Sequence, residues 1–252
     1  MTARRSLTAW TAGLALAAAL PAAGAELPTA DEVFARHRAA IGGDAIDKVR
    51  NAALEFNFAI PSMGLTTKGK AYQVFPDKAY MMIDLATVGV ANHEEGLVDG
   101  IVWRNSPQTG LQKLEGLERR MALQRARLDA FSGWKQLWQK AETVATAPVE
   151  GEPCYKVVLT PEEGTPVSSW FSTRSGLLLE MEVPMPQMNT VVSIKLRDYR
   201  AVDGVTLAHR IEQEGMMSMT IEYTQIRFNA DDIPPGRFDL PAGLTPPAPT
   251  SK

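Results

Sequence analysis

The sequence predicts a mainly β (α+β) protein, in which a strongly curved antiparallel sheet of about eleven strands forms an incomplete β-barrel. Alternating apolar and polar residues recur over most of the chain, and tight Asp-Gly turns join neighbouring runs at Asp99-Gly100 and Asp203-Gly204. Asp-Gly between alternating runs is a strong hairpin signal, because glycine adopts positive φ freely and aspartate tolerates it. Helical spacing near the N-terminus and mid-chain adds an N-terminal helix and a central helical insert. We expect both to cover the concave face of the sheet.

Residues 1–25 have the pattern of a cleavable secretory signal peptide. Arg4 and Arg5 form a basic segment, residues 7–20 are rich in Ala and Leu, and Ala23-Gly24-Ala25 is a small-x-small cleavage site. The apolar run is too short to predict a membrane span, and no cysteine follows it to carry a lipid anchor. We therefore expect a soluble periplasmic protein with one folded domain over residues 26–240. The Pro- and Ala-rich residues 241–252 are expected to be a disordered tail.

Charge and cysteine content narrow the possible partners. Removing residues 1–25 leaves 24 basic and 29 acidic residues, so the formal net charge changes from −3 to −5. This acidic balance argues against a nucleic-acid partner, which needs a basic surface. Cys154 is the single cysteine and has no partner for an internal disulfide.

The first predicted element is a helix that begins at Thr29 or Asp31, either of which can cap it. The Gly42-Gly43 pair ends this helix, and a short second helix is expected over residues 44–49. Four residues define the buried side of the first helix by their spacing: Val33, Phe34, His37 and Ile41.

The following residues read as strands separated by turn residues. The chain also returns to strand-like sequence from Ala141 onward. The runs with strand composition or period-2 alternation are 54–60, 66–75, 78–85, 89–98, 101–105, 155–159, 167–172, 177–183, 192–197, 205–212 and 217–224.

A helical insert interrupts the strands over residues 114–131. Its apolar stripe steps by three and four residues, and most of its charged residues lie off the stripe. We expect this helix to be a lid over the sheet; in the alternative, its arginines meet anionic lipid head groups. The stripe consists of Leu114, Leu117, Met121, Gln124, Leu128 and Phe131.

Three stretches resemble the LolA/LolB-like superfamily, specifically the bacterial outer-membrane lipoprotein-sorting proteins. Residues 38–46 (RAAIGGDAI) resemble its opening of helix, double glycine and helix. Residues 170–178 (WFSTRSGLL) resemble its aromatic, turn and Gly-Leu hairpin, and residues 198–211 resemble its most recognisable hairpin. These motifs specify turns and strand ends, and the likeness spans nearly all of residues 26–240.

The resemblance implies an incomplete barrel with a helical lid over an apolar cavity. It also implies a carrier that binds lipoprotein acyl chains or other lipids and moves them between the inner and outer membranes, with membrane transfer proteins as partners. The missing lipid-anchor cysteine favours the LolA-type soluble carrier. A carrier of this kind is not an enzyme, and the sequence predicts no cofactor.

Motifs for chemistry are sparse. Residues 132–135 fit Ser-x-x-Lys, but the Ser-Asp-Asn and Lys-Thr-Gly elements that accompany this motif in penicillin-recognising enzymes do not occur. His37, His93 and His209 lie in three different predicted elements, so a zinc site is not expected. We therefore predict no catalytic or metal-binding residue.

The predicted ligand-binding residues are apolar positions on the inferred inner register, with two on the lid. Methionine is prominent among them, and its flexible thioether suits surfaces that accept varied apolar ligands. The thirteen residues are Leu54, Phe56, Phe58, Leu117, Met121, Leu179, Met181, Ile194, Leu207, Ile211, Met217, Met219 and Ile221.

Two other functions are compatible with the same pattern. The first is an envelope interaction protein of the same fold with a filled core and no cavity. The second is an exported hydrolase, which requires clustered polar groups in a cleft, and the sequence offers no convincing set.

Overall fold

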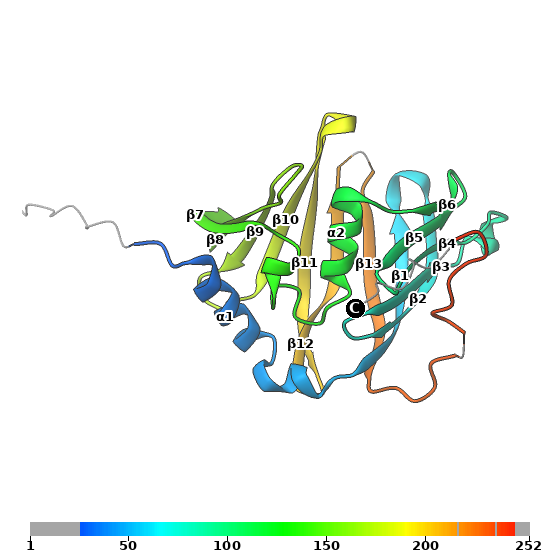
Figure 1. The fold of residues 1–252 in the computed structure, drawn as a ribbon, viewed down its shortest axis with the longest axis horizontal. Coiled ribbons are helices and arrows are strands. Elements are labelled where there is room, and N and C mark those ends of the chain that lie inside the picture. Colours follow the sequence, from blue (N-terminus) through cyan, green and yellow to red (C-terminus); the bar gives the residue numbers. More distant parts are fainter. Residues whose placement is uncertain (1–25, 216, 235, 245–252) are drawn as a thin grey trace, which may run out of the picture.

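The computed structural model describes residues 26–215, 217–234 and 236–244 (Figure 1). The predicted signal peptide and residues 245–252 of the predicted tail lie outside this part of the chain. Residues 241–244 of the tail form a turn in which the Leu244 amide donates to the Pro241 carbonyl over 3.1 Å.

Thirteen strands form a single antiparallel sheet. The strands before the helical insert are β1 (Asn51–Ile60), β2 (Leu65–Val74), β3 (Lys78–Ile83), β4 (His93–Val98), β5 (Ile101–Ser106) and β6 (Gly110–Lys113). The strands after it are β7 (Lys140–Val149), β8 (Glu152–Thr160), β9 (Val167–Ser172), β10 (Leu178–Met185), β11 (Thr190–Val202), β12 (Val205–Glu214) and β13 (Met219–Phe228).

The sheet is a meander joined at its middle by one long-range pair. Its order is β6-β5-β4-β3-β2-β1-β13-β12-β11-β10-β9-β8-β7, and β1 pairs with β13 to unite the first and last strands of the chain. The sheet curves strongly but stays open, because β6 and β7 are its two edges and do not pair with each other. The predicted incomplete barrel is confirmed.

The predicted number of about eleven strands is too low by two, and the additional strands are the two edges. β6 has four residues and precedes the helical insert directly, so no alternation is visible in it. β7 is rich in Ala and Thr and carries Pro148, and half of its residues are exposed. Edge strands pair on one side only, so they need less apolar pattern than central strands.

The N-terminal helix α1 spans Ala30–Ala40 and is capped by Thr29. The Thr29 side chain accepts from the Glu32 amide, and the Glu32 carboxylate accepts from the Thr29 amide in return, which is a capping box. A short 3₁₀ helix, η1 (Gly43–Lys48), follows at the position of the predicted second helix. Three further 3₁₀ turns are η2 (Pro61–Met63), η3 (Ala86–Val88) and η5 (Pro186–Met188).

The helical insert is shorter than the predicted range of 114–131. Helix α2 spans Gly116–Arg125, and residues 126–133 form turns before the 3₁₀ turn η4 (Trp134–Gln136). The buried Asp129 carboxylate accepts from the amides of Phe131 and Ser132 over 3.3 and 3.1 Å. This local bonding offers the backbone an alternative to the helix, so the apolar stripe continues into a turn.

The first and third motif regions of the resemblance contact each other at one end of the sheet. Gly42 has φ +132°, and a Cβ atom there would lie 2.7 Å from the Gly204 carbonyl oxygen. The Thr206 amide donates to the Ile41 carbonyl over 2.9 Å. The double glycine therefore lets the end of α1 lie directly on the β11–β12 hairpin.

Among the described residues, no helix combines the length and the apolar composition needed to cross a membrane. Both α1 and α2 lie on the concave side of the sheet (Figure 1). α1 lies towards β7, and α2 lies towards β5.

Candidate functional site

Two large apolar clusters divide most of the concave face of the sheet, and a smaller one packs Ala122 and Leu123 of α2 against Leu97 and Val102. We call the first the covered half, because residues of α1, α2 and the following turns pack onto β8, β9 and β10 there. Its buried residues are Ala30, Val33, Phe34, Met121, Phe131, Trp138, Val157, Leu159, Val167, Phe171, Leu178, Met181 and Val183.

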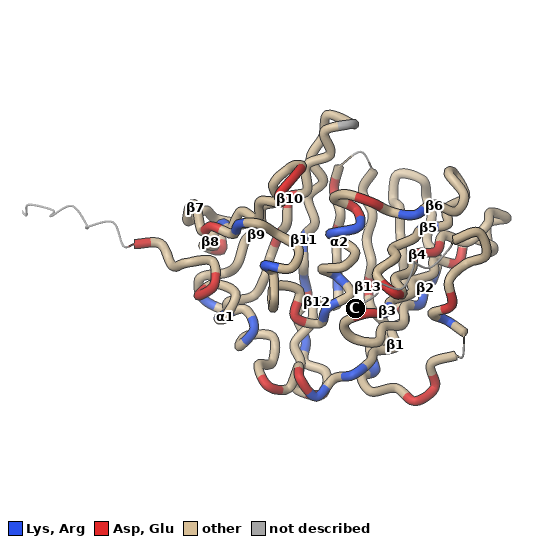
Figure 2. Tube along the Cα trace, in the orientation of Figure 1, with Lys and Arg blue, Asp and Glu red and all other residues tan. Residues whose placement is uncertain are grey.

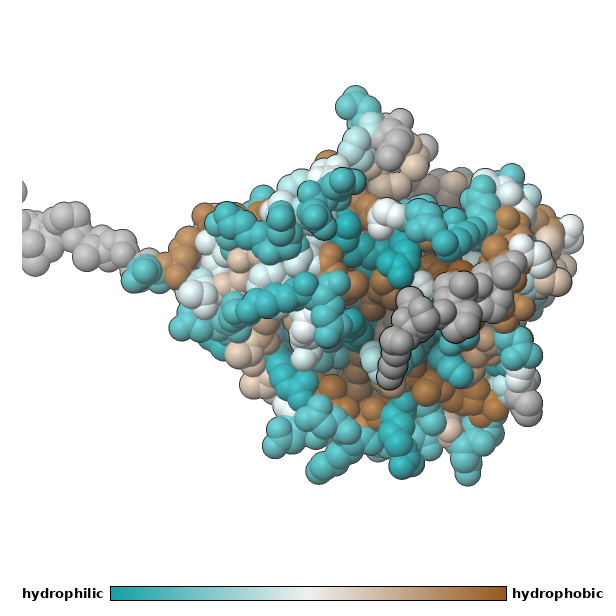
Figure 3. Space-filling model, viewed as in Figure 1, coloured by the Kyte–Doolittle hydropathy of each residue, from teal (hydrophilic) through white to brown (hydrophobic). Residues whose placement is uncertain are grey.

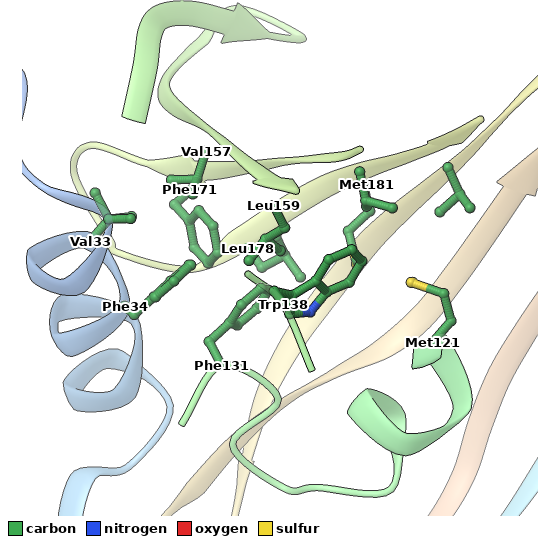
Figure 4. Packing of buried hydrophobic residues seen from close by; sticks show 13 residues of the cluster. Val33, Phe34, Met121, Phe131, Trp138, Val157, Leu159, Phe171, Leu178 and Met181 are labelled. Atoms are coloured by element: carbon green, nitrogen blue, oxygen red, sulfur yellow. The ribbon is translucent and has the colours of Figure 1, made fainter. Parts of the chain in front are cut away.

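An aromatic group closes the covered half (Figure 4). Phe131, in the turn after α2, stacks on Phe34 of α1 with ring centroids 4.9 Å apart, and its edge meets Phe171 of β9 at the same distance. Trp138 lies between this group and Met121, and its indole N–H donates to the Gln124 side chain over 3.2 Å. Aromatic pairs of this geometry stabilise packing beyond the area they bury.

We call the second half the trough. Phe56, Phe58 and Ile60 of β1 and Ile83 at the end of β3 are buried in it. In the part of the chain that the structure describes, no residue of α1 or α2 belongs to this cluster. Its half-buried members are Leu65, Ala71, Met81, Leu85, Met219, Ile221 and Tyr223.

The register of the strands explains why these side chains gather. In the ladders of β1, Phe56 lies opposite Tyr223 and Gly69, and Phe58 lies opposite Ile221. The ring of Phe56 occupies the space that a side chain at position 69 would fill, since a Cβ atom there would lie 2.2 Å from the ring. Large residues on β1 and β13 thus face a small one on β2, and the apolar floor becomes continuous.

A charged group borders the trough where α2 meets the sheet. We call it the Glu95 cluster. Glu95 of β4 lies opposite Met81 and Arg104 in the strand ladders, so it faces the same side as the trough. Its carboxylate accepts from Arg104 over 2.6 Å and from Arg125 of α2 over 3.2 Å. The cluster therefore ties the end of the lid helix to the sheet.

Two further side chains complete the Glu95 cluster. His93 Nε2 lies 3.6 Å from the Glu95 carboxylate, and Arg104 also donates to Glu118 of α2 over 2.9 Å. Burial alone would raise the pKa of Glu95, but the contact with His93 and the charges of Arg125 and Arg104 outweigh it and lower the pKa to about 2. Glu95 is thus a carboxylate at neutral pH.

Tyr223 lies between the charged and apolar parts of the site. Its ring meets that of Phe56 edge-on, with centroids 6.0 Å apart. Burial raises the pKa of its hydroxyl, and the nearby charge of Arg125 opposes that rise. The trough therefore presents a neutral phenol beside an ion-paired guanidinium.

Most of the thirteen predicted ligand-binding residues lie on the concave side, but in different clusters. Phe56, Phe58, Met219 and Ile221 belong to the trough, and Leu54 lies beside it, opposite Ala71. Leu117, Met121, Met181 and Ile194 belong to the covered half. Ile211 lies in register between Leu196 and Ile221, where the two halves meet, and Leu207 packs against Ile41 and Ile46 at the end closed by η1.

Two of the thirteen residues lie away from these surfaces. Leu179 packs with Val149, Cys154 and Trp170 in a separate cluster. A β-bulge between Leu178 and Glu180 shifts the register there, so Leu179 does not share the face of Met181. Met217 lies in the β12–β13 turn, before β13 begins, and is 41% exposed.

Sequence reasoning did not identify Ile83, Tyr223 or the Glu95 cluster as parts of the site. Ile83 and Tyr223 stand at alternating positions of predicted strands, so the period-2 pattern contained the signal. The members of the Glu95 cluster come from two strands and a helix, with no spacing that relates them. The strand ladder brings Glu95 and Arg104 together, and the packing of α2 on the sheet adds Glu118 and Arg125.

Two hollows of the described surface lie away from the trough, and none of the thirteen predicted residues lines them. One hollow of about 330 Å³ lies between α1 and residues 129–135, and includes Asp31, Arg38 and Trp134. The other, of about 280 Å³, lies at the hairpin tips around Asp77 and Asp99. Neither hollow lies in the trough, whose half-buried side chains stay partly exposed on the concave face.

The Ser-x-x-Lys motif and the histidines, which were weighed as catalytic or zinc-binding residues, make contacts typical of structural residues. Lys135 lies 3.5 Å from the Asp31 carboxylate, and the buried His37 Nδ1 lies 3.0 Å from the Gly176 carbonyl oxygen. His209 Nδ1 bonds to the Leu207 carbonyl over 3.0 Å. Within the described residues, no group of three or more His, Cys, Asp or Glu side chains is arranged to hold a metal ion.

Comparison with solved structures identifies the fold. A LolA superfamily protein from Nitrosomonas europaea superimposes with a TM-score of 0.57 at 12% identity, over 84% of this chain and 98% of its own. The chain has a LolA-like fold. The LolA-like fold also relates it to a DUF1329 family protein from Desulfovibrio piger, with a TM-score of 0.57 at 14% identity over 83% of this chain and 96% of that one.

A third LolA-like structure carries a functional description. It is described as an outer membrane lipoprotein-sorting protein domain from Vibrio parahaemolyticus, and superimposes with a TM-score of 0.53 at 12% identity over 82% of this chain and 94% of its own. No known protein-family model matches the sequence, and no curated protein matches it. At these identities the likeness establishes the fold alone.

Proposed function

We propose that the protein is a periplasmic carrier that binds lipoprotein acyl chains or other lipids and transfers them between the inner and outer membranes. The observation that carries the proposal is the trough, an apolar surface on the concave face to which neither α1 nor α2 contributes a residue in the described chain. On the face shown in Figure 3, hydrophobic side chains are visible deep between α2 and the strands, with hydrophilic residues around them.

Binding in the trough would be driven by burial of methylene groups. Each CH₂ removed from water contributes roughly 0.8 kcal/mol, so a long acyl chain gains several kcal/mol from partial burial. The trough is lined by partly exposed side chains, and an acyl chain that enters more deeply must displace some of them. Met81 and Met219 are suited to this, because unbranched methionine repacks at low energetic cost.

Helix α2 would act as the movable part of the site. It contributes Met121 and Leu117 to the covered half, while Arg125 and Glu118 hold it to the sheet through Glu95 and Arg104. These ion pairs are partly exposed, and such pairs contribute little individually. Release of these pairs, and of the apolar contacts of Ala122 and Leu123 with the sheet, would let α2 move outwards and join the two apolar halves into one surface.

The proposal includes export of the protein to the periplasm and a role in binding without catalysis. The signal-like residues 1–25 favour export to the periplasm. The polar groups beside the trough are ion-paired and tie α2 to the strands. Binding and release of a lipid need only these apolar and anchoring residues, so we assign no reaction to the protein.

The test is recovery and uptake of lipid. Purified protein would be extracted with organic solvent for lipid mass spectrometry, and delipidated protein titrated with a fluorescent fatty acid below its critical micelle concentration. We expect bound lipid and saturable uptake, and we expect Ile221→Glu to weaken uptake at least about tenfold by placing a charge in the trough. Val144→Glu is the matched control, since Val144 is exposed on β7.

The absence of both lipid and uptake would contradict the carrier. A second candidate function, an envelope interaction protein with a filled core, is favoured by the two hollows lying away from the trough. It predicts empty extracts and no effect of Ile221→Glu on fatty-acid fluorescence, so the same experiment separates the two functions.

A further inference from the structure

The hairpins of the sheet lie at two opposite ends, because consecutive antiparallel strands reverse direction. Five hairpins that are neighbours in the sheet share one end. In sheet order they are β5–β6, β3–β4, β1–β2, β12–β13 and β10–β11. We call this end the uncharged rim, for the reason that follows.

No Asp, Glu, Lys or Arg occurs at any of these five hairpins. The uncharged stretches, in the same order, are residues 105–112, 85–92, 56–67, 215–221 and 183–194. The hairpins at the opposite end all carry charge. They include Asp77, Asp99, Glu150, Arg174 and Asp203. Figure 2 shows this asymmetry, with tan tips at the top of the molecule and red and blue residues along the bottom.

Exposed apolar side chains concentrate on the same rim. Eight large hydrophobic residues are exposed in the described chain, and only Leu27 and Val144 lie away from the rim. Met63, Val88 and Met188, in three separate hairpins, are 64%, 53% and 49% exposed. The remaining three are Val90, Val191 and Met217.

The trough opens onto this rim. Ile60 and Leu65 flank the β1–β2 turn, Leu85 follows the end of β3, and Met219 begins β13, and all four belong to the trough. An apolar path therefore runs from the exposed hairpin tips into the concave face. The adjoining β8–β9 hairpin carries Glu162 and Glu163 and bounds the rim on one side.

We propose that the uncharged rim docks on the surface of a lipid bilayer and inserts its hairpin tips between the head groups. Its apolar side chains project from separate tips. A fluid interface accepts such projections independently, whereas a protein partner would need a matching pocket for each. The absence of charge removes the main penalty for entering the apolar layer. The choice of a bilayer rests on the proposed function, because the trough would then face its lipid source.

The test measures vesicle binding and soluble uptake separately. Full-length mature protein would be floated with vesicles of pure phosphatidylcholine and of phosphatidylcholine with phosphatidylglycerol, at low and high salt. We expect binding to both compositions with little salt dependence, since no basic residue is involved. The variant Met63→Ser/Val88→Ser/Met188→Ser should bind at least about tenfold more weakly, whereas Val144→Ser should bind as wild type does.

Fluorescent fatty-acid uptake, measured without vesicles, distinguishes the two proposals. A rim variant that loses vesicle binding but keeps uptake and its unfolding temperature supports docking. If neither wild type nor the rim variant takes up fatty acid, but the folded variant loses the vesicle binding that wild type has, docking is supported and the carrier is contradicted. Docking would be overturned if the rim variant bound vesicles as wild type does, or if it lost fatty-acid uptake together with vesicle binding. It would also be overturned if the wild-type protein bound only anionic vesicles at low salt, or self-associated in place of binding vesicles.

Discussion

Gly42 lies against the backbone of Gly204, so close that a Cβ atom at position 42 would be 2.7 Å from the Gly204 carbonyl oxygen. This contact joins the end of α1 to the hairpin that begins the long β12 strand. A backbone oxygen at the turn cannot move aside as a side chain would. The helix and the hairpin are therefore positioned by the same glycine.

We predict that Gly42→Ala destabilises the protein by about 3 kcal/mol, because the φ of +132° and the short contact both oppose a side chain. Gly43→Ala is the matched control. It also has positive φ (+53°), but a Cβ atom there meets nothing within 4 Å, so a loss of only about 1 kcal/mol is expected. Urea unfolding of the two variants measures the difference. Equal losses would show that the contact with Gly204 is unimportant.

Phe131→Ala should loosen the covered half. The ring is 2% exposed and stacks between α1 and β9, so its loss should lower the free energy of unfolding by roughly 3–5 kcal/mol. Hydrogen exchange should accelerate in residues 116–138 more than in the central strands. Val144→Ala, on an exposed site, is expected to change stability by less than about 0.5 kcal/mol. Uniform exchange throughout the chain would argue against a separable lid.

Glu95→Gln should change the pH dependence of stability. The pKa of Glu95 is about 2 in the fold against an ordinary 4.5. Its ionised form therefore stabilises the fold above pH 4.5, and this contribution is lost as the pH falls from 4.5 towards 2. We expect the variant to be about 2–3 kcal/mol less stable at pH 7 and to converge with wild type in acid.

Urea titrations at several pH values measure this convergence. Glu118→Gln removes the more exposed partner of Arg104 and should cost less than about 1 kcal/mol. A gap between wild type and Glu95→Gln that stayed constant down to pH 2 would contradict the assigned role of the carboxylate.

His37 adds a second, separate acid sensitivity. Burial lowers its pKa below the ordinary 6.5, although the Gly176 carbonyl and Asp129 oppose the shift. The neutral ring therefore belongs to the fold, and stability should fall as the pH drops through the unfolded-state value of about 6.5. His37→Gln should flatten the stability profile below pH 6.5, as measured by thermal unfolding. An unchanged slope would exclude His37 as its source.

The central architecture was predictable because it rests on local patterns. Alternation on β1, β12 and β13 and the Asp-Gly turns indicated a curled antiparallel sheet, and Thr29 was one of the two residues expected to cap α1. The edges were not predictable in the same way. β6 has four mostly exposed residues, and β7 alternates in exposure but places only Ala and Thr on its less exposed side as far as Ala147, so hydrophobicity alone does not define either strand. Their pairing with β5 and β8 defines them.

The site was predictable only where the register stayed regular. Phe56, Phe58 and Ile221 alternate with their neighbours through uninterrupted ladders and share the concave face. The bulge beside Leu179 reversed the side that alternation assigned to it. The Asp129 turn likewise ended α2 before its apolar stripe did. Both features depend on local backbone hydrogen bonding, which hydrophobic periodicity does not predict.

The open edges of the sheet have a mechanical consequence. A closed barrel has a radius determined by its strand number and shear. Here twelve strand pairs connect β6 to β7 without closing a ring, so a small change of twist at each pair alters the spacing of the two edges while every ladder is kept. In the proposed carrier, ligands of different width would therefore be accommodated by a change in the twist of the sheet, with the hydrogen bonds between its strands kept.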